Sequence, residues 1–137
     1  MPYIKSKASL PLATLTLLCV LLASCAPGKK PVVESPPKTY KFLFQTQASW
    51  YGKEFQGRKT ASGERFNMHE LTAAHRTLPF GTKLLVKNIS NQKKVVVRVN
   101  DRGPFAKGRG IDVSFAAASR LGFISQGETV VRVYKEE

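Results

Sequence analysis

Three short runs of branched aliphatic residues constrain the fold of this chain more than any other feature. Residues 83–88 (KLLVKN) and 94–99 (KVVVRV) are rich in the residue types that favour strands, and residues 129–134 (TVVRVY) also alternate. Residues 89–92 (ISNQ) join the first two runs and supply turn chemistry, so this pair is predicted to form a β-hairpin. The third run is expected to be the terminal strand.

Two short helical segments are expected beside these strands. Residues 114–121 (SFAAASRL) predict a helix that Ser114 caps at its start and Gly122 ends, and residues 69–74 predict a helical turn. A helix, a glycine turn and a strand thus occur twice, at 73–86 and 117–133. Two such units are too few for a solenoid and favour a closed barrel of two related halves, although Ala-rich segments can also be alike by chance.

The N-terminus has the pattern of an export signal. Lys5 and Lys7 precede an apolar run at residues 10–22, which is shorter than the roughly 20 apolar residues of a membrane-spanning helix. Leu22, Ala23 and Ser24 lead into Cys25, as in a lipobox. We expect residues 1–24 to be a lipoprotein signal peptide and Cys25 to carry the lipid. An ordinary signal peptide and a retained signal anchor are the alternatives.

The residues after Cys25 divide into a linker and one domain. Residues 25–45 contain four prolines with lysines between them, which predicts a disordered, extended tether. Residues 46–137 are expected to form the barrel domain. Both cysteines, Cys19 and Cys25, lie ahead of this domain, so its hydrophobic core alone must stabilise it.

The strongly basic composition narrows the class of partner. The formal net charge is +13, and +11 without Lys5 and Lys7. Such a charge favours an anionic partner, although solubility alone is an alternative explanation. An exported protein rarely meets nucleic acid, so anionic lipid headgroups and acidic wall polymers are the remaining candidates.

Asp101 is the leading candidate for a catalytic side chain. It follows directly after the strand that ends at Val99, and a carboxylate at the mouth of a barrel can transfer protons. Pro104 and Phe105 would desolvate it, whereas Arg102 would favour its charged form. A loop aspartate that accepts hydrogen bonds from nearby backbone N–H groups is the equally weighted alternative.

The other polar candidates are weaker on their own. Glu64 lies in a loop of small residues (60–64, TASGE) and by itself suggests a solvated surface charge. His75 suggests a half-buried histidine after a helical turn. Asp112 is expected to be structural, assisting the start of the following helix through its charge. No metal-ligand spacing, phosphate-binding loop or marked serine triad is present, so no metal and no cofactor are expected.

Aromatic residues cluster around the same segments. Rings pack against the apolar faces of sugars, so exposed aromatics here would suit a glycan groove. We expect Tyr51 and Phe105 to be exposed and most of the other rings to fill the core. The full set is Trp50, Tyr51, Phe55, Phe66, Phe80 and Phe105.

These residues occur in ordered motifs that resemble the rare lipoprotein A family. The resemblance covers residues 48–133, and several motifs together make it specific. The matching segments are 48–52 (ASWYG), 58–66 (RKTASGERF), 72–75 (TAAH), 78–82 (LPFGT), 97–105 (VRVNDRGPF) and 109–114 (RGIDVS).

The resemblance implies a mainly β fold, a six-stranded double-psi β-barrel with short helices. It also implies an endolytic lytic transglycosylase that cuts the bond between N-acetylmuramic acid and N-acetylglucosamine in peptide-poor peptidoglycan strands. By position, Asp101 matches the family's catalytic aspartate, and Glu64 and His75 match its other active-site residues. The candidates for substrate binding are Tyr51, Arg58, Arg102 and Phe105, with Arg76 and Arg109 as further cations for lactyl carboxylates.

The implied biology is that of a monomeric lipoprotein of the cell envelope. Its partners would be peptidoglycan strands and, through the lipid on Cys25, the membrane, with Ala26 favouring the periplasmic face of the outer membrane. Many relatives carry a SPOR domain, and none is recognised in this sequence, so septal targeting through one is not expected. The alternative function is an expansin-like barrel that binds glycan without cutting it.

Overall fold

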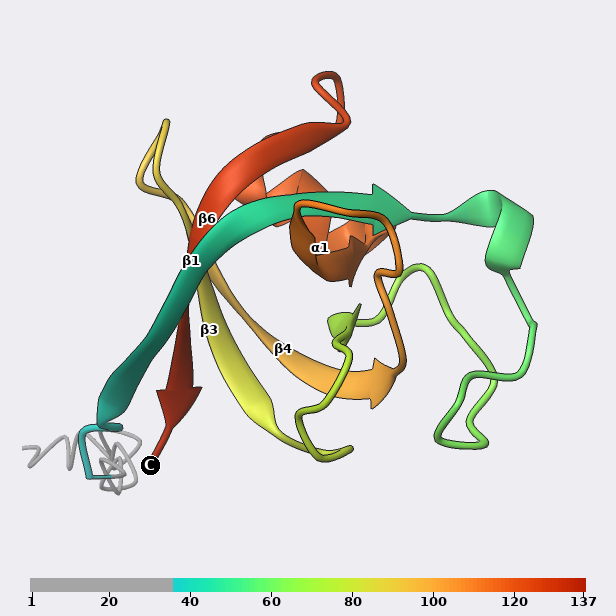
Figure 1. The fold of residues 1–137 in the computed structure, drawn as a ribbon, viewed down its shortest axis with the longest axis horizontal. Coiled ribbons are helices and arrows are strands. Elements are labelled where there is room, and N and C mark those ends of the chain that lie inside the picture. Colours follow the sequence, from blue (N-terminus) through green and yellow to red (C-terminus); the bar gives the residue numbers. More distant parts are fainter. Residues whose placement is uncertain (1–35) are drawn as a thin grey trace, which may run out of the picture. The chain divides into compact units, whose positions relative to one another are not determined.

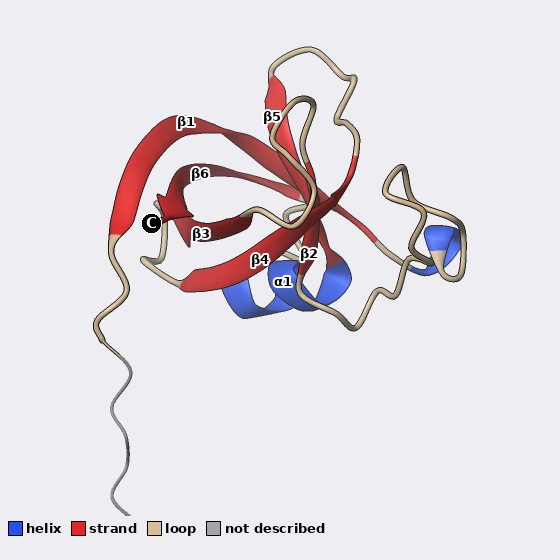
Figure 2. Cartoon of the chain, turned by 90° about the horizontal axis from the view of Figure 1, so that it is seen from below, coloured by secondary structure: helices blue, strands red, loops and turns tan. Residues whose placement is uncertain are grey.

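The computed structural model describes residues 36–137. Six strands close into a barrel in the order β1-β5-β2-β4-β3-β6 (Figures 1 and 2). The mainly β, six-stranded barrel predicted from the sequence is therefore confirmed. The elements are β1 (Tyr40–Tyr51), a 3-10 turn (Lys53–Phe55), β2 (Thr72–Ala74), β3 (Lys83–Asn88), β4 (Lys94–Asp101), β5 (Arg109–Ser114), α1 (Phe115–Leu121) and β6 (Glu128–Glu136).

The predicted hairpin and terminal strand are both present. Strands β3 and β4 pair antiparallel from Lys83 opposite Arg98 to Lys87 opposite Lys94. Alternate residues of each strand are buried, as expected for a sheet with one face in the core. Strand β6 completes the closure by pairing antiparallel with both β1 and β3.

The start of the barrel differs from the predicted boundary at residue 46. Strand β1 begins at Tyr40, which lies opposite Glu136 of β6. Residues 40–45 (YKFLFQ) contain three aromatics that favour a strand, but the preceding prolines and lysines made this segment look like linker. The predicted signal peptide, Cys25 and the first part of the predicted linker lie outside the described residues.

The helical turn predicted at residues 69–74 is wrong. Thr72–Ala74 form the short strand β2, which pairs parallel with β4 and antiparallel with β5. All three residues are buried. Pairing on both sides therefore outweighs the helical preference of the two alanines. As a consequence, the repeated helix, turn and strand is only partly correct, because the first of the two units contains a strand in place of the helix.

Helix α1 forms as predicted. The Ser114 hydroxyl oxygen accepts a hydrogen bond from Ala117 N at 3.3 Å and donates to the carbonyl of Glu70 at 2.6 Å. Gly122 adopts the left-handed conformation (φ 73°), which ends the helix at low steric cost. Ala117, Ala118 and Leu121 face the core. No helix among residues 36–137 is long and apolar enough to cross a membrane.

Aliphatic side chains fill the barrel. Eight of them, from four different strands, are at most 1 % exposed, and burial of each contributes about 1.5–3 kcal/mol. They are Leu84, Val86, Val97, Val99, Ile111, Val113, Val131 and Val133. The expectation that most aromatics of the motifs fill the core is wrong: Phe66 is buried, whereas Phe55, Phe80 and Phe105 are exposed. The barrel interior is narrow enough for branched aliphatic residues to fill it.

Candidate active site

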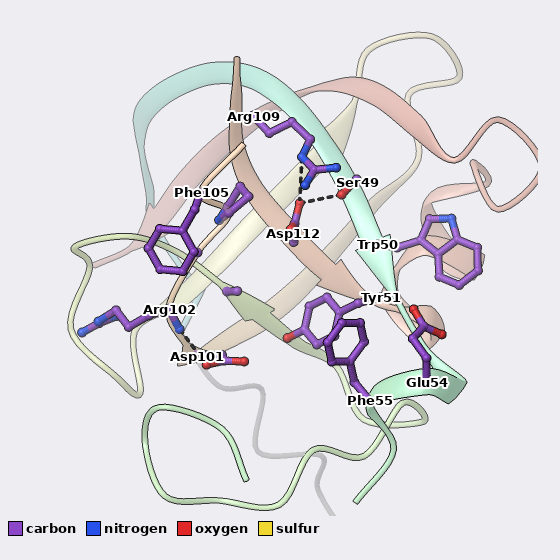
Figure 3. Close-up of a pocket in the computed structure, with 13 residues that line it drawn as sticks. Ser49, Trp50, Tyr51, Glu54, Phe55, Asp101, Arg102, Phe105, Arg109 and Asp112 are labelled. Atoms are coloured by element: carbon purple, nitrogen blue, oxygen red, sulfur yellow. Dashed lines mark hydrogen bonds and ion pairs between the residues drawn. The ribbon is translucent and has the colours of Figure 1, made fainter. Parts of the chain in front are cut away.

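The main pocket lies at the ends of β1 and β4 and against β5. It has a volume of about 310 Å³, at the lower end of the size range of small-molecule sites. Asp101, Asp112 and Glu54 contribute its carboxylates, and Tyr51, Phe55 and Phe105 contribute aromatic surface (Figure 3). A second hollow of about 280 Å³, which includes Tyr51 and Arg58, also reaches Asp101. Asp101 therefore borders two adjoining hollows.

Asp101 is half-buried at the end of β4, and the backbone holds one of its oxygens. Oδ1 accepts hydrogen bonds from the N–H of Ala61 at 2.9 Å and of Arg102 at 2.8 Å. Among residues 36–137, no donor is hydrogen-bonded to the other oxygen, Oδ2. Any proton on this carboxyl group would therefore sit on Oδ2, which is available to a ligand. Asp101 therefore also does what the alternative interpretation of a loop aspartate predicted, because its Oδ1 accepts hydrogen bonds from backbone N–H groups.

Asp112 shares the pocket with Asp101, which the sequence analysis did not foresee. Its Oδ1 accepts a hydrogen bond from the Ser49 hydroxyl at 2.6 Å and lies 3.7 Å from Arg109 Nε. The structural role expected of Asp112 lies in these contacts with Ser49 and Arg109. Its expected effect on the start of the following helix stays a prediction. Alternation within β5 was the available signal: Ile111 and Val113 are fully buried, so the residue between them faces the other side of the sheet.

Tyr51 lies beside both carboxylates. Figure 3 shows its hydroxyl in the space between Asp101 and Asp112. Burial raises the pKa of Tyr51 above its ordinary value, and the charges of the two aspartates raise it further, so the phenol stays protonated as a donor. The hydroxyl is buried and has no hydrogen-bond partner of good geometry within residues 36–137. The Thr72 hydroxyl is a polar neighbour but does not meet that geometry. Tyr51 is therefore half-buried and not exposed as predicted, whereas Phe105 is 83 % exposed.

Glu64 lies outside the pocket, on an exposed loop. Its carboxylate accepts hydrogen bonds from both terminal nitrogens of Arg98, at 2.7 and 3.0 Å, and from Asn100 Nδ2 at 3.2 Å. These bonds lower the pKa of Glu64 below its usual value. The same loop, residues 60–64, provides the Ala61 N–H that binds Asp101. Glu64 thus fastens to β4 the loop that holds the Asp101 carboxylate.

His75 likewise contacts Asp101 through the backbone. Its N–H donates to the carbonyl of Asp101 at 3.1 Å, while its ring lies against Phe44 and borders a separate hollow. Ring atom Nδ1 accepts the N–H groups of Thr77 and Leu78, at 3.2 and 3.0 Å, so the neutral ring carries its proton on Nε2. Burial lowers the pKa of His75, and the nearby Arg102 and Arg76 lower it further.

The four candidate arginines have different roles in the structure. Arg102 lies over the Phe80 ring at 3.8 Å and donates to the carbonyls of His75 and Leu78. Arg76 donates to two carbonyls of the loop that follows Asp101 and to the carbonyl of the first residue of β5. Arg109 contacts Asp112 and Glu128. Arg58 is exposed beside the second hollow and lies over the Phe55 ring at 5.3 Å, so it is the candidate best placed to meet a ligand.

The structure thus brings together only part of the predicted site. Asp101, Tyr51, Arg102 and Phe105 border the main pocket, and Arg58 borders the adjoining hollow. The side chains of Glu64 and His75 lie outside this pocket, and His75 contacts Asp101 only through its backbone N–H. Within the described part of the chain, no group of three His, Cys, Asp or Glu side chains has an arrangement that could hold a metal ion.

This closed barrel, whose pocket holds carboxylates from the end of β4 and the middle of β5, is a double-psi β-barrel protein. Residues 44–133 match the model of the lytic transglycolase family of these barrels, and the chain belongs to this family.

Relatives of known description come from several bacteria. An endolytic peptidoglycan transglycosylase RlpA of Neisseria meningitidis is 57% identical over 93 residues, which are 68% of this chain and 39% of that protein. Its namesake from Vibrio cholerae is 52% identical over 92 residues, 67% of this chain and 35% of that protein. The chain therefore spans little more than a third of the length of these relatives.

Solved structures support the fold alone. A Streptomyces papain inhibitor superposes with a TM-score of 0.53 and 20% identity, over 74% of this chain and 94% of that chain. An expansin of Clavibacter michiganensis has the same TM-score and identity, over 67% of this chain and 50% of that chain. Proteins with such different descriptions share the barrel, so the fold does not decide the activity.

Proposed function

We propose that this protein is an endolytic peptidoglycan lytic transglycosylase and that Asp101 is its acid and base. The observation that carries the proposal is the position of Asp101, with Oδ2 free, at the border of two adjoining hollows. A glycan strand that crosses both hollows would place one of its internal bonds over this oxygen. The family and the printed names of the relatives support the same reaction.

The reaction needs one group that first gives and then takes a proton. Protonated Oδ2 of Asp101 donates to the glycosidic oxygen as the bond from C1 of N-acetylmuramic acid to that oxygen breaks. The resulting carboxylate accepts the proton of the muramic C6 hydroxyl as its oxygen bonds to C1. The products are a 1,6-anhydromuramic end and an N-acetylglucosamine end with a free hydroxyl. No water is consumed, so the second carboxylate that hydrolases require is not needed.

The surrounding residues would bind and position the strand. The exposed Phe105 ring can pack against a sugar face, and the half-buried Tyr51 ring borders the same pocket. Arg58 would attract the lactyl carboxylates that peptide-free strands expose. Glu64 and His75 would act on Asp101 through the loops that they hold, as positioning residues.

The decisive experiment compares the protein with its Asp101→Asn variant on peptide-free strands and on intact sacculi, with products read by mass spectrometry. Asparagine retains an oxygen that can accept the two N–H groups but cannot cycle the proton. We expect anhydromuramic ends from the parent and at least about 100-fold fewer from the variant. Glu70→Gln, the same change of a carboxylate to an amide at an exposed residue that borders neither hollow, is the matched control and should stay within about twofold of the parent.

Other outcomes would identify a different function. New reducing ends would mean a hydrolase. Strand binding without any new ends, by parent and variant alike, would support the expansin-like alternative.

The proposal places the protein in the cell envelope as a monomer, anchored by a lipid on Cys25 to the periplasmic face of the outer membrane. The support is the signal-like sequence of residues 10–25 and the wall polymer named for the relatives. Metabolic labelling with a palmitate analogue tests the anchor. Label on the parent and none on Cys25→Ser is expected, and equal label on both would refute lipidation at Cys25.

A further inference from the structure

The outer face of β4, β3, β6 and β1 carries two parallel rows of side chains with unusual composition. The strand register places Lys94, Lys87, Arg132 and Gln45 side by side in one row. The next row along the strands is apolar and consists of Val96, Leu85, Tyr134 and Phe42. These four strands lie next to one another in the barrel (Figure 1).

The cation row is unfavourable in the isolated protein. Lys87 lies directly opposite Lys94 on one side and Arg132 on the other, and residues so paired have Cβ atoms only about 5 Å apart. None of the ion pairs within residues 36–137 includes Lys87, Lys94 or Arg132. A solvated face needs no such row, whereas an anionic partner would neutralise it.

A hollow at one end of the two rows has the chemistry of a sugar site. Phe42, Gln45, Arg132 and Tyr134 line it. The Phe42 and Tyr134 rings meet edge to face at 5.6 Å, and Phe42 is 52 % exposed, which leaves ring surface for the apolar face of a sugar.

The polar pair in the hollow completes this chemistry. Arg132 Nε donates to Gln45 Oε1 at 3.1 Å, which orients the guanidinium. Within residues 36–137, its two terminal nitrogens form no other hydrogen bond and suit a carboxylate. The Gln45 amide can pair with hydroxyl or acetamido groups.

We propose that this outer face, residues Phe42, Gln45, Lys87, Lys94, Arg132 and Tyr134, is a second, non-catalytic binding surface for an anionic glycan strand. The rows cross four strands, a width of roughly 14 Å, which suits several linked sugar rings better than a single ion. A lipid surface is less favoured, because the aromatic rings line a hollow together with the polar Gln45 and Arg132. In naming a wall glycan with lactyl carboxylates as the ligand, the proposal rests on the proposed function.

Binding of labelled peptide-free strands at low salt tests the proposal. The parent is the full chain with Cys25→Ser, to prevent lipidation, and Asp101→Asn, to prevent cutting. Lys87→Ala/Arg132→Ala should bind about tenfold more weakly, the effect of losing two partly solvated charge contacts. Tyr134→Ser should also weaken binding. Strands whose carboxylates have been amidated should bind the parent about as weakly as native strands bind the double variant.

The matched control is Lys93→Ala/Arg120→Ala, which removes the same charge from the hairpin turn and the end of α1. It should bind within about twofold of the parent. Equal binding by the control and by Lys87→Ala/Arg132→Ala would overturn the proposal. The proposal would also be overturned if Lys87→Ala/Arg132→Ala lost binding to phosphatidylglycerol vesicles while its binding to strands stayed unchanged. That result would identify the face as a membrane-binding surface. Circular dichroism checks that each variant is folded.

The same double variant with Asp101 restored separates this proposal from the proposed function. The reference for cutting is the Cys25→Ser protein with both Asp101 and the outer face intact. If the restored double variant cuts short fragments at the rate of this reference but long strands more slowly, both proposals stand. If the reference itself cuts nothing while strand binding still depends on Lys87 and Arg132, the proposed function fails and the binding surface remains.

Discussion

Replacement of Glu64 distinguishes a loop clamp from a proton donor. Its carboxylate forms an ion pair with Arg98 at 2.7 Å, and both side chains are partly exposed (44 % and 36 %). An ion pair of this exposure contributes at most about 1 kcal/mol, even with two-point geometry. If Glu64 only fastens the loop that supplies the Ala61 N–H, Glu64→Gln should lower kcat/KM by about fivefold. Loss of a proton donor would cost about 100-fold to 10,000-fold.

The assay is the initial rate of anhydromuramic end formation from peptide-free strands, with Glu64→Gln, Arg98→Gln and the double variant compared. A clamp predicts that each single change has a similar effect and that the double variant is little worse than either, since both remove one interaction. Because Arg98 and Asn100 lower the pKa of Glu64, the clamp should persist at every pH above about 4.5 and be lost only below that value. A loss above 100-fold in Glu64→Gln with an active Arg98→Gln would refute the clamp.

Three further predictions concern stability. Burial lowers the pKa of His75, so the contribution of its neutral ring to the free energy of unfolding is complete above about pH 6.5 and declines as the pH falls from there toward the folded-state pKa. Between pH 7.5 and 5, the urea midpoint should therefore drop less in His75→Gln than in the parent. Equal drops in the two proteins would contradict this prediction. Asn88 is 2 % exposed and its side chain makes three hydrogen bonds, so Asn88→Ala should cost about 2–3 kcal/mol of unfolding free energy in urea, and a cost under about 1 would be inconsistent with that network. Lys87→Thr removes repulsion by Lys94 and Arg132 and should raise Tm by a few degrees in calorimetry, whereas a lower Tm would show that the row is not repulsive.

The features that could be predicted from sequence are those that short segments determine. The hairpin needs only two alternating runs and a turn, and α1 needs only Ser114 and Gly122 at its ends. Asp101 could be placed at the end of a strand because Val95, Val97 and Val99 alternate up to it. The six-stranded barrel was expected from these runs and from the family resemblance together.

The remaining features depend on contacts between distant segments. Thr72–Ala74 become a strand because β4 and β5 pair with them on both sides, and no local pattern contains that information. The position of Glu64 on Arg98, 34 residues away, follows from the path of its loop over β4. Asp112 could have been assigned to the pocket face from its position between two buried residues, had residues 109–114 been recognised as a strand.

The meeting of the first and last strands has a consequence for how this barrel is built into longer proteins. Glu137 N donates to the carbonyl of Thr39 at 3.0 Å, and Lys38 pairs with Glu136 at 2.6 Å, so the chain enters and leaves the barrel side by side. The pocket lies at the other end of β1, at Tyr51. Both chain connections therefore lie at the end of the barrel that is away from the pocket, so segments added at either terminus need not obstruct the pocket. A circular permutant in which these two termini are joined should also fold. Such a layout is suited to relatives in which the matched region is little more than a third of the protein.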